Sequence, residues 1–273
     1  MATCYRHPSR ETGVSCSNCG RPICPDCMTT TPVGMRCPEC ASQRTTVVRM
    51  REMASVPRVT YTLIAINVIV FLTEQGQFTI SGSSVYGKVV DEGFLSREAI
   101  NVAHQYWRLV SSAFLHESLL HIGFNMYLLY LLGRMLEPTL GSVRFAVIYF
   151  TAMLAGAFGA VFATAAPTLG ASGAIFGLMG AAVIDLRGRR VSVMESGIGG
   201  LILINLIFSF TFANISVGDH IGGLFGGALA ALALREADRR RVPALGFIAC
   251  ALLAAASVFA AIAVSGASGS GIA

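Results

Sequence analysis

Two residues in the second half of the chain have the types needed for nucleophilic catalysis. Ser172 lies in a run of small residues, GASGA, and His220 lies in the run DHIGG. A serine that reaches a histidine can give up its proton and attack a carbonyl carbon, so the pair predicts cleavage of an acyl bond. Taken singly, each has a plainer interpretation. Ser172 could be a helix N-cap among packing glycines, and His220 a structural histidine bonded to a neighbouring helix.

A second polar group could stabilise the negative charge that such an attack produces. His121 and Asn125 are four residues apart and therefore share one face of a helix. Two neutral donors on that face could bind the oxyanion of a tetrahedral intermediate, and loss of one such donor typically costs about 100- to 1,000-fold in rate. The alternative is that both side chains hydrogen-bond to a neighbouring helix.

The N-terminal segment carries a different chemistry. Its candidate metal ligands form four pairs with two residues between the members, and they are Cys4, His7, Cys16, Cys19, Cys24, Cys27, Cys37 and Cys40. This set predicts two structural zinc sites, because tetrahedral Zn²⁺ takes four thiolate or imidazole ligands. Protein ligands would fill every site, so we expect no cofactor in catalysis. So short a segment has little hydrophobic core, and the metal would supply its folding energy.

The elements that must position these residues belong to a membrane protein. Of the 273 residues, 54% are hydrophobic and 13% are charged, against about 45–50% and about 25% in soluble domains. The apolar stretches predict an all-α, polytopic transmembrane bundle. The seven predicted spans are 59–74, 112–133, 143–164, 172–187, 195–213, 217–235 and 242–264. No secretory signal opens the chain, so we expect the first span to direct insertion.

The distribution of charge and cysteine predicts the domains. They are a zinc-binding module at 1–43, a basic linker at 44–58, a six-helix core at 59–236, and a seventh helix with a short outer tail at 237–273. The loop at 75–111 is long, and we expect it to be structured. The net charge of +5 does not indicate a nucleic-acid partner, because the arginines lie beside apolar spans.

The basic residues also predict the orientation in a cell membrane. With the N-terminus in the cytosol, 17 of the 20 Lys and Arg residues lie on the inner side. The fourth and sixth spans then both run inward, so Ser172 and His220 lie near the outer surface. Small residues repeat every four positions on both spans and allow the helices to approach closely. The C-terminus would lie outside.

These motifs together resemble the rhomboid family of intramembrane serine proteases, over roughly residues 59–236. The residues that carry the resemblance are Trp107, Arg108, His121, Asn125, Glu137, Gly170, Ser172, Gly173, His220, Gly223 and Gly227. The resemblance implies a six-helix core and a water-filled cavity that opens outward. It also implies a Ser–His dyad, with Ser172 as nucleophile and His220 as general base. His121, Asn125 and the Ser172 backbone N–H would form the oxyanion hole.

Two positions depart from the usual pattern of that family. Phe176 stands where many members carry a tyrosine that packs on the catalytic histidine, so stacking is kept but the hydroxyl is lost. Asp219 stands where a small residue is usual. Consecutive helical residues point about 100° apart, so we expect Asp219 not to orient the His220 ring, although its charge could change the pH optimum.

The cysteine spacing resembles a B-box-type zinc finger. That resemblance implies one site made of Cys4, His7, Cys24 and Cys27 and a second made of Cys16, Cys19, Cys37 and Cys40. Pairing in sequence order is the alternative. The module would lie on the cytosolic side, opposite the catalytic residues, and we expect it to bind a cytosolic protein partner or to regulate the enzyme.

Three functions are compatible with these patterns. The first is an endopeptidase in the lipid bilayer that cuts single-span membrane proteins whose helix unwinds near the outer leaflet. The second is a proteolytically silent relative that binds transmembrane clients, although such relatives usually lack the serine or the histidine and both are present here. The third is a small-solute transporter. Many transporter folds contain internal repeats, and the sequence contains no convincing one.

Overall fold

The computed structural model describes residues 2–42, 56–73, 88–164, 166–211 and 215–267. The chain divides into two compact units, Met1–Ala54 and Ser55–Ala273, and each has its own core. Most of the predicted linker, the first part of the predicted loop at 75–111 and the end of the C-terminal tail lie outside the described residues.

The N-terminal unit consists of short elements around a core of cysteines. Its elements are β1 (Ala2–Thr3), β2 (Glu11–Thr12), η1 (Pro25–Cys27), β3 (Thr29–Thr31), β4 (Gly34–Arg36) and α1 (Pro38–Ser42). Strand β1 pairs antiparallel with β2, and β3 pairs antiparallel with β4. The buried core is Ile23 together with six cysteine side chains. The interior of this unit is therefore built largely from candidate metal ligands.

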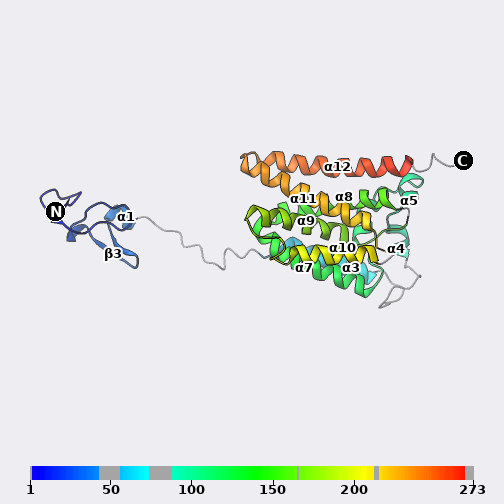
Figure 1. The fold of residues 1–273 in the computed structure, drawn as a ribbon, viewed down its shortest axis with the longest axis horizontal. Helices are drawn as coiled ribbons and strands as arrows, with labels where there is room; N and C mark the ends of the chain where they lie inside the picture. The colour runs from blue at the N-terminus through cyan, green and yellow to red at the C-terminus, as the bar shows by residue number, and fades with distance from the viewer. Residues whose placement is uncertain (1, 43–55, 74–87, 165, 212–214, 268–273) are drawn as a thin grey trace. The chain divides into compact units, whose positions relative to one another are not determined.

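The second unit is a bundle of long helices (Figure 1). They are α3 (Arg58–Thr73), α7 (Leu119–Leu140), α8 (Ser142–Ala163), α9 (Ser172–Gly188), α10 (Ile198–Thr211), α11 (Val217–Arg239) and α12 (Pro243–Ala267). Each overlaps one predicted span. Helices α7, α8, α11 and α12 are long and apolar enough to cross a membrane, and α3 and α10 are shorter apolar helices. The prediction of an all-α, polytopic bundle is confirmed.

The predicted second span, 112–133, differs at both ends from helix α7, which is Leu119–Leu140. The second span begins at Leu119 rather than at residue 112, because residues 112–114 form a separate 3-10 turn, η2 (Ser112–Phe114). Ser118 then starts α7 as its N-cap, where its side chain accepts a hydrogen bond from the backbone N–H of His121 at 3.2 Å.

Helix α11 packs against both α8 and α9, while α12 lies along α8 and α11 (Figure 1). Glycines allow this close approach. A Cβ atom on Gly223 would lie 2.0 Å from the Gly173 carbonyl oxygen, and one on Gly227 would lie 2.1 Å from the Gly177 oxygen. The small-residue stripes therefore hold α9 and α11 in backbone contact, as their spacing predicts.

Helix α9 is the interior helix of the bundle. Every residue from Gly173 to Ala182 is buried. Other helices expose large apolar side chains, among them Phe124, Phe210 and Phe259, which is 78% exposed. Exposed side chains of this kind suit a lipid solvent, and the burial of α9 explains why a helix of 17 residues suffices there.

The described part of the first long loop is structured. It contains α4 (Lys88–Gly93), α5 (Arg97–Asn101) and α6 (Arg108–Ser111). The buried Arg108 guanidinium donates to the carbonyl oxygens of Asp91 and Phe94 at 3.1 and 2.9 Å. Leu95 and Thr168 exchange two backbone hydrogen bonds of 2.9 and 2.8 Å. These bonds fix the loop against the segment that precedes α9.

Glu137 joins three helices at the opposite end of α7 from His121. Its carboxylate accepts hydrogen bonds from the backbone N–H groups of Val59 and Thr60, both at 2.9 Å, and from the Thr60 hydroxyl at 2.7 Å. The Ser142 hydroxyl donates a fourth bond at 2.6 Å. Glu137 thus satisfies the free N–H groups at the start of α3 and ties α3 and α8 to α7.

Candidate active site

Ser172 is the first residue of α9 and follows a turn that only glycine fits. Gly170 has a φ of +123°, and a Cβ atom there would lie 2.8 Å from Nε2 of His121. Its backbone N–H donates to the Ser112 carbonyl oxygen at 2.8 Å. The turn, which lies against the His121 ring, therefore places Ser172 at a helix N-terminus, where free backbone N–H groups can face an anion.

The face of α7 that carries His121 and Asn125 lies against this turn. The same Cβ position on Gly170 would be 3.7 Å from Nδ2 of Asn125. Among the described residues, Nδ2 of Asn125 and Nδ1 of His121 are buried and have no hydrogen-bond partner. A buried polar atom without a partner costs about 1–3 kcal/mol, so such atoms usually have a ligand, a water or a catalytic role. Both residues of the predicted oxyanion hole thus lie against the turn that immediately precedes Ser172.

His116 packs against the His121 ring. Its ring is 5.0 Å from the His121 ring in an edge-to-face arrangement, and the side chain is 1% exposed. Burial, with His121 as a second cause, lowers the pKa of His116 to about 3. His116 therefore stays neutral at physiological pH and supports the His121 ring without adding a charge near the site.

His220 is held on α11 by contacts from two other helices. The Phe176 ring of α9 stacks on it with centroids 4.1 Å apart and planes inclined by 16°. On α10, the Ser209 hydroxyl oxygen lies 2.5 Å from Nδ1 of His220. The ring is 6% exposed and therefore has little freedom to turn.

The Ser172 hydroxyl bonds to the residue next to that histidine. It donates to Oδ2 of Asp219 at 3.3 Å. Asp219 fits between two glycines, because Cβ atoms on Gly156 and Gly173 would lie 2.6 and 2.3 Å from its Oδ1. A bond from Ser172 to His220 is not among those that the described residues make, so this predicted pairing stays a prediction.

The contacts of Ser209 and Asp219 at the site could not be predicted from the sequence. The one signal for Ser209 is that it interrupts an apolar run, where a polar residue requires a partner. For Asp219, helix geometry predicted only that its side chain would point away from His220. Which partner it meets instead depends on how α9 packs against α11.

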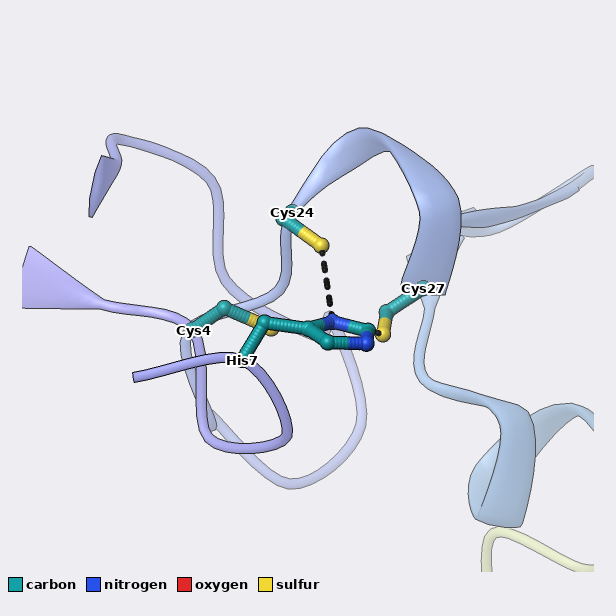
Figure 2. Close-up of side chains that lie close together, drawn as sticks. All are labelled: Cys4, His7, Cys24 and Cys27. Atoms are coloured by element: carbon teal, nitrogen blue, oxygen red, sulfur yellow. Dashed lines mark hydrogen bonds between the residues drawn. The ribbon is translucent and has the colours of Figure 1, made fainter. Parts of the chain in front are cut away.

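The cysteine-rich unit holds two candidate metal centres. Cys4, His7, Cys24 and Cys27 form the first (Figure 2), and Cys16, Cys19, Cys37 and Cys40 form the second. The ligand atoms within each cluster all lie within 4.8 Å of one another. This grouping is the one that the B-box resemblance implies, and it differs from pairing in sequence order.

The distances in the first centre suit one shared cation. Nδ1 of His7 is 3.3, 3.4 and 3.9 Å from the sulfur atoms of Cys24, Cys27 and Cys4. Ligand atoms around a tetrahedral zinc ion, with bonds of about 2.0–2.3 Å, are about 3.5 Å apart. The donor set and its spacing therefore fit a tetrahedral metal ion.

The second centre contains a sulfur that is prepared for the thiolate form. The backbone N–H of Cys37 donates to Sγ of Cys16 at 3.3 Å, and this bond lowers the pKa of the Cys16 thiol to about 6 although burial opposes it. Burial and the neighbouring thiols raise the pKa of Cys27 in the first centre to about 11. Thiolates are the form that binds metal, so a dication would stabilise ionisation that the crowded thiols oppose.

Comparison with known proteins identifies the family of the helical unit. A Rhomboid domain matches residues 103–237. "Putative rhomboid protease YdcA" of Bacillus subtilis is 32% identical over 145 residues, which are 50% of this chain and 71% of that protein. The chain belongs to the rhomboid family. Its rhomboid domain and four long apolar helices make it a multi-pass membrane protein.

The names of two other rhomboid relatives indicate different activities. "Rhomboid protease GluP" of Bacillus subtilis is 34% identical over 181 residues, covering 65% of this chain and 35% of that protein. "Inactive RHOMBOID-like protein 8" of Arabidopsis thaliana is 33% identical over 121 residues, which are 44% of this chain and 34% of that protein. The chain thus spans about a third of the length of these two relatives. Family membership alone leaves both a protease and a silent relative open.

Proposed function

We propose that this rhomboid-family protein is an intramembrane serine endopeptidase that cuts single-span membrane proteins. The observation that carries the proposal is that the turn immediately before Ser172 lies against His121 and Asn125, whose buried Nδ1 and Nδ2 atoms have no hydrogen-bond partner among the described residues. Unsatisfied donors in a buried site next to a serine at a helix N-terminus are what the oxyanion of a tetrahedral intermediate requires.

The proposed reaction begins with transfer of the Ser172 proton to Nε2 of His220. The serine oxygen then attacks the scissile carbonyl carbon, and the carbonyl oxygen takes the negative charge. His121, Asn125 and the Ser172 N–H would bind that oxygen. The protonated His220 next gives its proton to the leaving amine. His220 then takes a proton from water, which attacks the acyl-enzyme, and the released Ser172 oxygen regains that proton. Stacking on Phe176 would keep the ring in place through both transfers.

Two further parts of the proposal rest on charge and on the resemblance. The Lys and Arg distribution supports a cytosolic N-terminus and a site near the outer face, with the C-terminus outside. Substrate helices must unwind before cleavage, so we expect small or helix-breaking residues near the cut. The domains would be the N-terminal module at 1–43, the linker at 44–58, the protease core at 59–236 and the added helix at 237–273.

The N-terminal module would be a B-box-like zinc domain. Each cluster supplies four thiolate or imidazole donors, and a bound Zn²⁺ would supply folding energy to a unit whose core is mostly cysteine. We propose that it takes two structural zinc ions and binds a cytosolic partner.

One observation favours the second candidate function, a silent client-binding protein. The Ser172 hydroxyl donates to Asp219, and a nucleophile held by a carboxylate is not yet paired with its base. Catalytic hydrogen bonds are often long or misaligned before substrate binds, so this arrangement also suits a resting protease.

Reconstitution in liposomes with a single-span substrate separates the two functions. We expect cleavage by the wild type, and none by Ser172→Ala. Cleavage by both proteins would point to a contaminating protease. If neither cuts, a fluorophosphonate probe decides, because it labels only an activated serine. Absence of Ser172 labelling would reject the protease in favour of the silent relative.

A further inference from the structure

Ser209 makes two contacts that together fix where its single proton lies. The residue is on α10 and is 2% exposed. Its hydroxyl oxygen is 2.7 Å from the Asn205 carbonyl oxygen, one helical turn back, and 2.5 Å from Nδ1 of His220. A hydroxyl has one proton to donate and two lone pairs that accept.

A backbone carbonyl can only accept, so the Ser209 proton must point at Asn205. If the hydroxyl donated to His220 instead, two oxygen lone pairs would face each other at 2.7 Å inside the bundle. The remaining contact therefore has Nδ1–H of His220 as the donor and the Ser209 oxygen as the acceptor. A neutral imidazole with its proton on Nδ1 carries its free lone pair on Nε2.

That tautomer is the one the proposed reaction needs. Nε2 must accept the Ser172 proton, and the Nδ1 proton must stay where it is. In serine proteases with three catalytic residues, a buried carboxylate bonded to Nδ1–H does this work, and disturbing the tautomer lowers the rate severely. Here the carboxylate nearest the site, Asp219, is bonded to Ser172.

We infer that Ser209 is a positioning residue that takes the place of the third member of a triad, by holding His220 with its proton on Nδ1 and its lone pair on Nε2. This inference rests on the proposed protease function. Phe176 restrains the plane of the same ring from α9, and the Ser209 contact restrains its rotation within that plane.

The test compares Ser209→Ala with Ser209→Thr in the full-length protein. Alanine removes the acceptor, whereas threonine keeps a hydroxyl that can bond to the carbonyl four residues back. Ser257 of α12 provides the matched control. It is also buried, and its hydroxyl donates to the Leu253 carbonyl at 2.8 Å, but among the described residues it makes no hydrogen bond to His220.

We expect Ser209→Ala to lower kcat about tenfold, the size of one lost hydrogen bond, with KM little changed. Ser209→Thr should restore most of kcat, and Ser257→Ala should leave it unchanged. Melting temperatures of the two alanine variants should be similar. Fluorophosphonate labelling of Ser172 should slow in Ser209→Ala in proportion to kcat.

Three results would overturn the inference in distinguishable ways. An active wild type whose Ser209→Ala variant keeps full kcat would reject the role of Ser209 alone. A loss of kcat that threonine does not restore, together with a lower melting temperature, would assign Ser209 to packing. A wild type that neither cleaves nor labels would reject the proposed function and this inference with it.

Discussion

The Ser172 hydroxyl donates its hydrogen bond to the carboxylate of Asp219, at 3.3 Å, on the residue next to His220. Helix geometry explains how adjacent residues serve different partners. Side chains at positions 219 and 220 point about 100° apart, so Asp219 meets the start of α9 while His220 meets Phe176 and Ser209. The proposed nucleophile is thus held by the carboxylate of Asp219, while His220 faces other partners.

We predict that Asp219→Asn raises kcat about fivefold or more. The amide keeps the volume that fits between Gly156 and Gly173 but removes a negative charge beside the developing oxyanion. Two like charges about 4 Å apart repel by at least about 1 kcal/mol, which corresponds to about fivefold in rate. The measurement is initial cleavage rate in liposomes. A slower Asp219→Asn enzyme of unchanged melting temperature would instead show that the carboxylate assists catalysis.

The contact between α9 and α11 should not tolerate a methyl group. Gly223→Ala would place a Cβ atom 2.0 Å from the Gly173 carbonyl oxygen, so the helices must separate. We expect a loss of about 1–3 kcal/mol in stability and a loss of cleavage, because Ser172 and His220 would move apart. Gly200→Ala on α10 is the control, since no atom lies within 4 Å of that Cβ. Thermal unfolding in detergent gives the comparison, and equal melting of both variants would contradict this account of the packing.

Glu137 should contribute far more to the free energy of unfolding than an exposed glutamate does. Glu137→Ala leaves the buried donors of Thr60 and the half-buried donors of Val59 and Ser142 without their acceptor, so we expect about 3 kcal/mol of destabilisation. Glu236→Ala removes only exposed ion pairs with Arg239 and Arg240, and should change stability by about 0.5 kcal/mol or less. Unfolding of both variants in mixed micelles measures the difference. Similar losses would mean that the three helices are held together by other contacts.

Metal content can distinguish the two ways of pairing the zinc ligands. If the clusters seen in the structure bind the metal, Cys4→Ser/Cys24→Ser disables one site and the protein keeps one zinc. Pairing in sequence order would put these two residues in different sites, and both ions would be lost. The matched variant Cys4→Ser/Cys16→Ser has the opposite expectation, with both ions lost in the clusters of the structure.

Elemental analysis of the purified full-length protein gives the zinc count for each variant. We expect two ions in the wild type. Wild-type protein without bound metal would reject the zinc module. Cleavage by Ser172 should survive the loss of zinc, because no cluster residue belongs to the proposed active site.

The helices and most of the candidate site residues could be predicted from the sequence alone. In a bilayer, the backbone N–H and C=O groups of an apolar stretch of about 20 residues are satisfied when the stretch forms a helix. Composition was therefore enough to place the spans to within several residues. The small-residue stripes of α9 and α11 likewise predicted their close contact, and the i, i+4 spacing placed His121 and Asn125 on one face. Each of these inferences uses a periodicity that lies within a single helix.

Which side chains from different helices meet depends on how the helices pack in the folded bundle. Ser209 and His220 lie on separate helices, and their contact depends on the depth and rotation of α10 against α11. The same holds for Ser172 and Asp219, whose contact requires the glycine-lined approach of α9, α8 and α11. A shift of one residue in any of these helices would turn its side chains by about 100° and replace these partners. The types of the catalytic candidates can therefore be read from the sequence, whereas the hydrogen bonds that orient them depend on helix packing.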